Sequence, residues 1–571
     1  MGSASRATFE VQRQRDGRWT MESICETEDE ARSFGRKMFS DRKCAGVRIV
    51  RNWQRADGQI AETVVHEETR IIADDDNSSR IVAIEEPPPI CRTQEEFYAL
   101  EARSTVQRLL RNYLEKVFLT PTEIIHNYKE LKRLQDSDNL FPSAVDRVAT
   151  LQSRVTGEDS RERRDFIYKT VDAMAARARK ADALKLPSLH GTSFNAVVTQ
   201  IGSMAPPDDR DYLVLTALSR ELVGTRNWLG KLQRLIQFTA EEGLRPDAMA
   251  LLDGVIADLI GAQMLQDLMG WQPSLADALC HMFDLAEGKM PFKDTVEADD
   301  PTVILNKLFA AQLLPSSKAT LVDRVLRHLR GAQPLYRSDP SREMDAFRKV
   351  GQRVMGPRNM LGGSETAEAL TVRFSRMVDQ GGAPGRRAAI RGVLTSYVET
   401  PHRLIYLLDL SSTELAKEHM ADVTEHLKGI CRSTDFNAVI PRSVPPKERM
   451  RRVTEMHRAV MASTLPEAAR RDLAGGLDDL LAEYIISEGI IEKLDHKDAS
   501  LRERATWLVQ FCAAQILPEG RALKLARDRV ISLLRQTNFD ARFVEGMADA
   551  ATAQKALRDF HHLLVKAGFG G

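Results

Sequence analysis

The chain has 571 residues with 81 basic and 81 acidic side chains, so its formal net charge is zero. Proteins that bind nucleic acid usually carry a basic excess that neutralises phosphates, and the even balance argues against that class of partner. Hydrophobic residues make up 43% of the chain and aromatic residues only 6%, which predicts a soluble, mainly helical protein rather than a β-rich one.

The length of the apolar runs and the spacing of the cysteines indicate the cellular compartment. No stretch contains the ~18 uninterrupted apolar residues that a membrane helix requires, and the first residues lack the apolar core of a secretory signal. The six cysteines are scattered without a Cys-x-x-Cys pair, which favours buried, reduced thiols. We therefore expect a cytoplasmic protein without membrane insertion.

The N-terminal part, residues 9–65, alternates apolar and polar residues with the period of two that is typical of strands. Thr27 and Glu30 form a capping-box pattern at the start of one helix. The apolar face of this helix is predicted to hold Ala31, Phe34, Met38 and Phe39. The order strand, strand, helix, strand, strand predicts a small α+β domain with one helix on a sheet.

A change of pattern follows at residues 74–94, where acidic residues and three consecutive prolines predict an exposed linker. Within it, Ile81–Ile84 is either an extra edge strand or a docking segment. From Glu95 onward the apolar period becomes about 3.6, which is typical of helices. One apolar stripe between residues 106 and 117 predicts the first helix of this part, ended by Thr120 and Pro121.

Two features of the next segment favour surface structure. Basic clusters at 161–164 and 177–180 are interleaved with acidic residues, so we interpret them as a solvated helix face. Prolines at 187, 206 and 207 predict a loop-rich connector over residues 183–210.

The remaining chain contains internal repeats. Residues 310–315 and 513–518 both read Ala-Ala-Gln, an aliphatic residue and Leu-Pro, and both precede a helix pattern with Asp-Arg-Val. We expect the Ala-Ala-Gln to end one helix and the proline to lie in the first turn of the next. Related segments begin at residues 432 and 535, and a second related pair begins at residues 340 and 446. The spacing within each pair indicates a repeating unit of about 100 residues. This length predicts multi-helix bundles packed as an array.

The predicted fold is therefore mainly α, with a small N-terminal α+β domain before an array of related multi-helix bundles. Six segments are expected: an α+β domain at 1–73, a proline-rich acidic linker at 74–94, a helical domain at 95–210, and helical repeats at 211–339, 340–445 (diverged) and 446–571. The loop at 287–301 is an insertion in the first repeat, and insertions of this kind gather on one face, often a binding face.

A glycine-rich stretch, Gly381–Arg391, precedes a helix pattern and offers backbone amides and arginines to an anion. Its candidate anion ligands are Gly385, Arg386, Arg387 and Arg391. It lacks the Gly-Lys-Ser/Thr ending of a P-loop and follows no predicted strand, so an ordinary loop between helices is favoured over a phosphate site.

A candidate metal site consists of His419, Asp422 and His426, which helical spacing places near one face. One helix rarely supplies three ligands to a structural metal, so an ordinary surface helix is favoured. No cofactor is predicted, and no residue occupies a context that singles it out as a general acid, base or nucleophile.

Two functions fit these observations. The first is a non-enzymatic cytoplasmic adaptor, scaffold or regulatory protein that binds protein partners through the helical array. The alternative is a ligand-regulated protein or an enzyme that binds a phosphate-bearing small molecule at Gly381–Arg391. The first function is favoured, because helical arrays usually bind other macromolecules and the sequence contains no recognisable catalytic motif.

Overall fold

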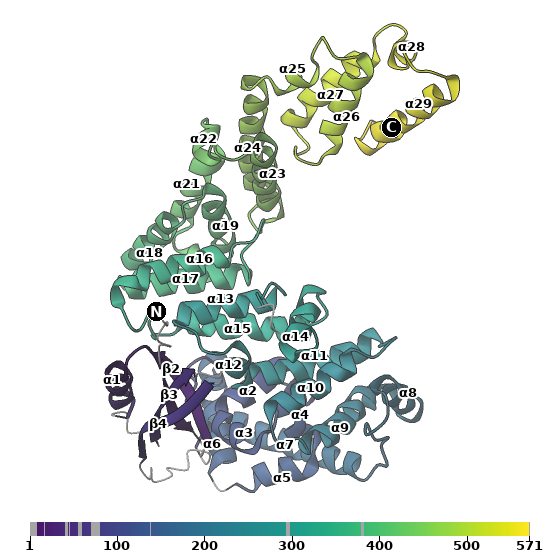
Figure 1. The fold of residues 1–571 in the computed structure, drawn as a ribbon. Coiled ribbons are helices and arrows are strands. Elements are labelled where there is room, and N and C mark those ends of the chain that lie inside the picture. The colour runs from purple at the N-terminus through teal and green to yellow at the C-terminus, as the bar shows by residue number, and fades with distance from the viewer. Residues whose placement is uncertain are drawn as a thin grey trace. The chain divides into compact units, whose positions relative to one another are not determined.

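The computed structural model describes residues 8–15, 18–39, 44, 46–54, 60–69, 80–137, 139–292, 297–378 and 382–569. The fold is mainly helical, with a small N-terminal sheet of four antiparallel strands, as the sequence predicts (Figure 1). The chain divides into two compact units, Met1–Trp271 and Gln272–Gly571.

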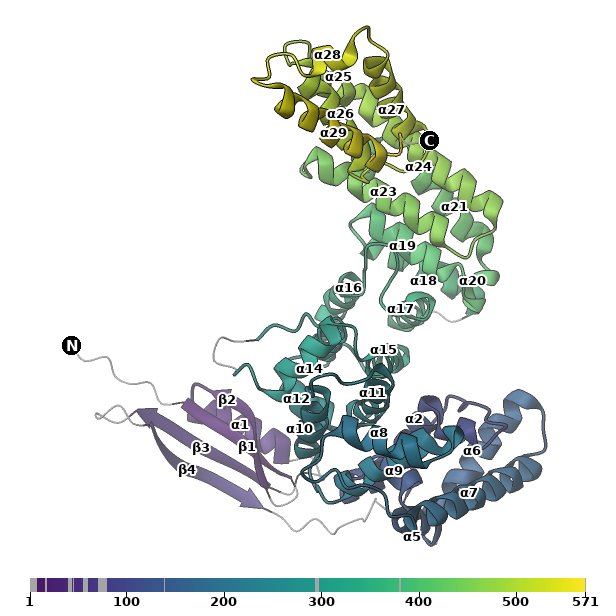
Figure 2. The same cartoon turned by 90° about the vertical axis from the view of Figure 1, so that its right-hand side faces the viewer.

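The sheet has the strand order β2-β1-β3-β4. Its elements follow the predicted order, with β1 at Thr8–Arg15, β2 at Arg18–Cys25, α1 at Glu28–Phe39, β3 at Gly46–Gln54 and β4 at Ile60–Thr69. Helix α1 packs on β1, β2 and β3 and covers one face of the sheet (Figure 2). Residues 16–17 and 55–59, where the sequence of each strand pair turns, lie outside the described residues.

The predicted apolar face of α1 is partly wrong. Ala31 is buried and Met38 and Phe39 pack against the sheet core, but the Phe34 side chain is 41% exposed. Gly35 faces the sheet instead, and a Cβ there would lie 3.2 Å from the Val47 side chain. The close approach of helix and sheet at this glycine rotates Phe34 toward solvent.

The rest of the first unit is helical. Its elements are a 3-10 turn at Glu95–Tyr98 and helices α2 (Leu100–Leu109), α3 (Arg111–Val117), α4 (Pro121–His126), α5 (Tyr128–Gln135), α6 (Leu140–Thr156), α7 (Ser160–Asp182), α8 (Phe194–Met204), α9 (Arg210–Val223), α10 (Trp228–Thr239), α11 (Pro246–Gly261) and α12 (Met264–Met269).

Three expectations for this part need correction. The stripe at 106–117 is split between α2 and α3, which break at Leu110. The connector at 183–210 contains the eleven-residue helix α8, which buries Phe194, Val197, Val198 and Ile201, so the prolines lie outside a helix rather than within one long loop. The basic cluster at 161–164 is not wholly solvated, since Arg163 is buried and donates to the Cys91 carbonyl.

Residues 80–92, which we call the strap, dock on these helices. The Val82 amide donates to the Leu109 carbonyl at 2.8 Å, Ile84 is buried, and no strand is assigned to this segment. Of the two alternatives for Ile81–Ile84, the docking segment is therefore confirmed.

The second unit is helical throughout its described residues. Its helices are α13 (Leu275–Ala286), α14 (Pro301–Ala310), α15 (Pro315–Arg330), α16 (Glu343–Arg353), α17 (Gly363–Met377), α18 (Gly382–Ser396), α19 (Thr400–Leu410), α20 (Glu414–Lys417), α21 (Met420–Cys431), α22 (Phe436–Val439), α23 (Pro446–Ala462), α24 (Glu467–Ser487), α25 (Ile490–Leu494), α26 (Leu501–Ala513), α27 (Arg521–Leu534), α28 (Phe539–Phe543) and α29 (Ala550–Lys566).

One packing pattern recurs in this unit. Helices α13, α19 and α26 each pack on a following helix, which is α15, α21 and α27 respectively. The same three helices also pack on α16, α23 and α29. Helices α22 and α28 both begin at the phenylalanine of the related motifs at 432–438 and 535–541.

The two Ala-Ala-Gln motifs adopt the same backbone conformation. Helices α14 and α26 end at the first alanine, and Gln312 and Gln515 have left-handed φ angles of 57° and 55°. The prediction for the proline is correct only in the first copy. Pro315 begins α15, whereas α27 begins at Arg521, three residues after Pro518. The second copy has two more residues between its proline and Asp-Arg-Val, which displace the helix start.

All six cysteines are free and buried, which agrees with the expectation for them. Burial raises the pKa of the Cys280 and Cys512 thiols to about 11 and that of Cys431 to about 12, so these thiols stay protonated at neutral pH. None of the helices in the described part of the chain combines the length and apolar character that crossing a bilayer requires.

Candidate functional site

The candidate anion ligands all belong to helix α18. Because α18 begins at Gly382, the amide of Gly385 lies inside the helix rather than in a loop before it. Arg386 forms an ion pair with Glu418 at 3.0 Å, and Arg387 donates from Nε to Asp422 at 2.6 Å. Arg391 is exposed. Two of the three arginines therefore already have carboxylate partners, and Gly381 lies outside the described residues.

The candidate metal ligands lie at the start of helix α21. His419 is the buried N-cap residue, Asp422 lies in the first turn, and His426 is half-buried one turn further on. Asp422 is the partner of Arg387, so the structure joins the two predicted sites through one ion pair. Among the described residues, no group of three or more His, Cys, Asp or Glu side chains is arranged to hold a metal ion.

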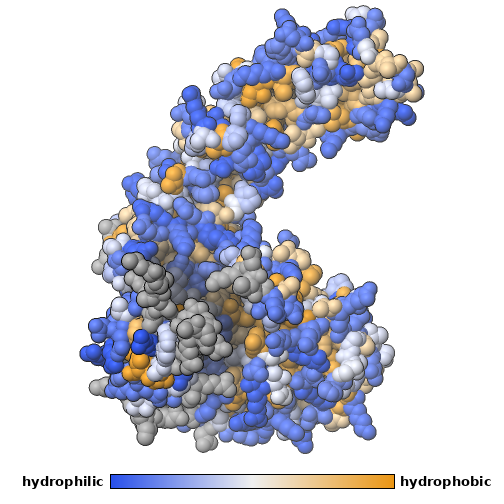
Figure 3. Space-filling model, in the orientation of Figure 1, coloured by the Kyte–Doolittle hydropathy of each residue, from blue (hydrophilic) through white to orange (hydrophobic). Residues whose placement is uncertain are grey.

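A groove of about 610 Å³ lies between α23, α26, α27 and α29 of the second unit. We call it the C-terminal groove. Its apolar lining comes from Met461, Ala462, Cys512, Leu517, Pro518 and Leu523, and its charged lining from Arg458, Glu519, Arg527 and Lys566. It includes Gln515 and Pro518, so the repeated motif forms part of its wall. Figure 3 shows apolar side chains gathered over the C-terminal helices.

The charged lining of the C-terminal groove is mainly basic. Arg458 donates to Glu455 at 2.7 Å and to the Gln515 carbonyl at 2.8 Å, so it is held against the motif. Arg527 pairs with Glu519 at 2.8 Å and donates to the Ala567 carbonyl. Burial lowers the pKa of the neighbouring His457, which leaves that ring neutral at neutral pH. Three cations face one carboxylate in the lining.

A second cluster, which sequence reasoning missed, surrounds helix α4 in the first unit. Every residue of α4 is buried. Glu123 forms an ion pair with Lys231 of α10, and both side chains are 0% exposed. Asp258 of α11 pairs with Arg103 of α2 at 3.0 Å and accepts hydrogen bonds from the amide and hydroxyl of Thr122. The α4 cluster thus joins four helices by charge-assisted hydrogen bonds.

The sequence contains a pattern that predicts the start of α4. Thr120 and Glu123 form a capping box, with the Thr120 hydroxyl accepting from the Glu123 amide at 3.2 Å and Glu123 accepting from the Thr120 amide at 2.8 Å. The proline at position 121 is the first helical residue. The sequence does not reveal that a cation from a distant helix, Lys231, meets this carboxylate in the interior.

The α4 cluster serves to position helices rather than to perform chemistry. Burial raises the pKa of the Glu123 and Asp258 carboxyls and lowers that of the Lys231 ammonium. Such shifts also occur in active sites, but Glu123 and Lys231 have no solvent access, so a substrate has no route to them. The cluster therefore fixes the position of α4 relative to α2, α10 and α11.

Comparisons with known proteins identify no relative. The chain matches no family model, no curated protein and no solved structure.

Proposed function

We propose that the protein is a non-enzymatic cytoplasmic adaptor or scaffold that binds protein partners through its helical second unit. The C-terminal groove is the observation that carries this proposal. It combines an apolar floor with a basic rim, and it is built from helix ends and connectors that present side chains from four helices. Mixed grooves of this kind suit recognition of a peptide segment.

The proposed repeat organisation rests on three recurring features. The packing of α13, α19 and α26 on their following helices recurs in order along the chain. Gln312 and Gln515 share a left-handed conformation in the connectors that precede α15 and α27. The segments 340–445 and 446–571 contain the related motifs that begin α22 and α28. We infer that these segments are successive copies of one bundle, and that arrays of this kind present extended binding surfaces.

The charge of the groove indicates what it binds. Because Arg458, Arg527 and Lys566 outnumber the one carboxylate in the lining, an acidic segment is favoured over a basic one. Met461, which is 41% exposed, offers an adaptable apolar contact at the floor. The partner is therefore an acidic peptide segment with an aliphatic or aromatic anchor.

The test uses peptides selected from a displayed random library against the full-length protein. We expect enriched peptides to be acidic with an apolar anchor, and a labelled peptide to bind at least tenfold more weakly to Met461→Asp. The substitution removes the apolar contact and repels the acidic peptide. Affinity should also fall with rising salt.

The matched control is Val155→Asp, which places the same charge at a side chain that is 59% exposed in the first unit. This variant should bind the peptide like the unmodified protein. If selection enriches no peptide, or if both variants bind equally well, the C-terminal groove is not the binding surface and the proposal fails.

A further inference from the structure

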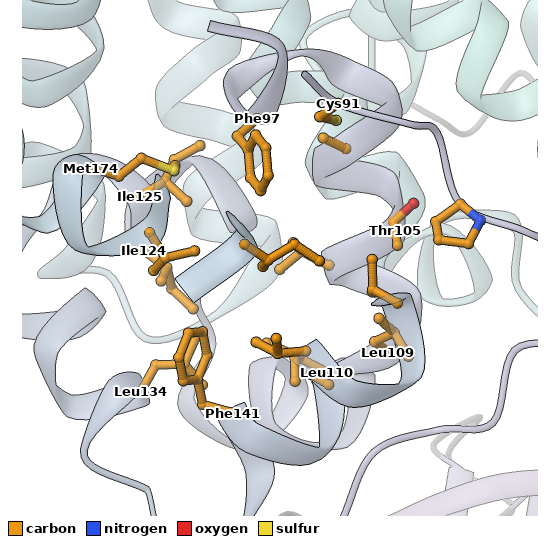
Figure 4. A pocket seen from close by; sticks show the side chains of 18 of the residues that line it. Cys91, Phe97, Thr105, Leu109, Leu110, Ile124, Ile125, Leu134, Phe141 and Met174 are labelled. Carbon is orange, nitrogen blue, oxygen red and sulfur yellow. The ribbon is translucent and has the colours of Figure 1, made fainter. Parts of the chain in front are cut away.

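The helical part of the first unit contains an apolar cavity of about 130 Å³. Side chains from α2, α4, α5, α6 and α7 surround it, with Leu110, Ile124 and Phe141 among those that point inward (Figure 4). Met174 of α7 closes another side, and the prolines at 88 and 89 of the strap complete the wall. This cavity is far larger than the small voids that packing normally leaves between core side chains.

The few polar side chains in the wall already have partners. The Thr105 hydroxyl donates to the Glu101 carbonyl at 3.1 Å. Gln152 donates to the Pro89 carbonyl and accepts from Arg163 Nε at 2.7 Å. The Cys91 thiol faces the Glu96 carbonyl at 3.6 Å. An occupant therefore finds no free hydrogen-bonding group in this wall, which selects against water and polar molecules.

The strap covers one side of the cavity with Pro88, Pro89 and Cys91. Arg147 donates to the Ile84 carbonyl at 3.1 Å, and Arg163 donates to the Cys91 carbonyl at 2.5 Å. Arg108 pairs with Glu86 at 3.1 Å. These contacts hold an extended segment, with no helix or strand of its own, over the apolar chamber. The other walls are packed helices and the 3-10 turn at Glu95–Tyr98, so the strap is the side of the cavity that is held without helix packing.

From this geometry we propose that the cavity is a binding site for a hydrocarbon group of about six carbons. An apolar cavity of about 150 Å³ lined by aliphatic and aromatic side chains binds benzene or xenon in another protein, which sets the scale. The hydrocarbon is either a free small molecule or the end of an alkyl chain. A polar head group has no partner inside the chamber, so in the second case it lies beyond the strap.

The test is carried out on the full-length protein labelled with ¹³C at the methionine methyl groups. Titration with benzene, and separately with xenon under pressure, should shift the resonance of Met174, which lines the cavity. Met249, which is buried in α11 away from it, should not move. Ala144→Leu extends a side chain from α6 into the chamber, and the Met174 shift should then be lost.

Ser143→Leu is the matched control, since it adds the same side chain at the adjacent, exposed position of α6 and should leave the benzene shift intact. Decanoate that displaces benzene identifies the end of an alkyl chain as the occupant, and decanoate without effect identifies a free small molecule. The proposal is overturned if neither benzene nor xenon moves Met174, or if Met249 moves equally. The wild-type comparison of Met174 with Met249 decides this even if Ala144→Leu fails to fold.

Discussion

Two helix N-termini, one in each unit, are capped by a carboxylate from a distant helix. At α4, Asp258 accepts from the Thr122 amide at 3.0 Å; at α27, Asp478 accepts from the Arg521 and Ala522 amides at 2.5 and 3.0 Å. Asp258 is paired with Arg103 in the interior, and Glu123 beside it is paired with Lys231. Asp478 is also buried, at 8% exposure, but the charged side chains around it are exposed: Arg521 pairs with Asp479 and Glu483.

The two caps share one geometry but differ in the charges around them, which are buried at α4 and exposed at α27. A carboxylate at a helix N-terminus satisfies free amides wherever it lies. In the interior it must also be neutralised, because an unpaired buried charge is costly, and the partner cation becomes indispensable. Next to Asp478 the neighbouring charges are in contact with water, and their exposed ion pairs contribute little to stability. The following predictions measure this contrast.

The largest effect is expected when the buried pair is broken. Lys231→Met leaves the Glu123 carboxylate without its cation, and the free energy of unfolding should fall by about 3–5 kcal/mol. Urea unfolding followed by circular dichroism measures this change. The double variant Lys231→Met with Glu123→Gln should recover part of the loss, whereas Lys417→Met, which breaks an exposed pair with Glu414, should change stability by less than about 1 kcal/mol. An equal loss in Lys231→Met and Lys417→Met would contradict the contrast.

Acid should destabilise the α4 region through His126. This ring is buried, lies 2.9 Å from the Thr122 carbonyl through Nδ1, and has a pKa lowered from 6.5 to about 3 because burial disfavours its charged form. Below pH 6.5 the unfolded chain gains a proton at this residue while the folded protein does not. The stabilising contribution is therefore complete above pH 6.5 and is lost as the pH falls toward 3, by up to about 1.4 kcal/mol per pH unit.

Unfolding measured between pH 7 and pH 4 tests the role of His126. The variant His126→Gln should have lower stability at pH 7 but a shallower loss on acidification than the unmodified protein. Parallel curves for the two proteins would show that another group causes the acid sensitivity.

At the second site, Asp478→Ala should lower the free energy of unfolding by about 1–2 kcal/mol, since two helix amides lose their acceptor. The neighbouring variant Asp479→Ala removes only the exposed pair with Arg521 and should cost well under about 1 kcal/mol. Thermal unfolding of the two variants side by side makes the comparison. Equal costs would indicate that Asp478 acts only through its charge.

The smallest expected effect is an increase in the free energy of unfolding. Gln312 and Gln515 both have left-handed φ angles, which glycine adopts more readily than glutamine. Gln312→Gly and Gln515→Gly should each raise the free energy of unfolding by about 0.5–1 kcal/mol. Opposite signs in calorimetry would contradict the equivalence of the two motifs on which the proposed repeat partly rests.

The predictable parts of the fold are those decided by local pattern. Period-two alternation predicts the four strands, and the apolar period of about 3.6 from Glu95 onward predicts the helical part of the chain. Prolines are less informative: those at 206 and 207 predict a long loop, whereas they lie between the end of α8 and a 3-10 turn at Pro207–Asp209. A proline marks a boundary without stating what lies on either side of it.

The candidate sites depended on long-range contacts that a local pattern does not encode. Nothing near Glu123 in the sequence indicates Lys231, and nothing near Arg387 indicates Asp422. The C-terminal groove could be anticipated only to the extent that its wall contains the repeated motif at Gln515 and Pro518. The sequence does not predict the cavity in the first unit, because its lining residues have the pattern of ordinary core positions in separate helices.

The strap also determines how the chain carries mechanical load and where it can be cut. A force that pulls the N-terminal domain away acts first on the bonds from Leu109, Arg147 and Arg163 to the strap, before any helix of the first unit is stretched. Peeling the strap would open the apolar chamber while α2 to α7 remain folded. A truncated protein beginning at Glu95 would lack this wall altogether, so the helical part should be expressed from Arg80 or earlier.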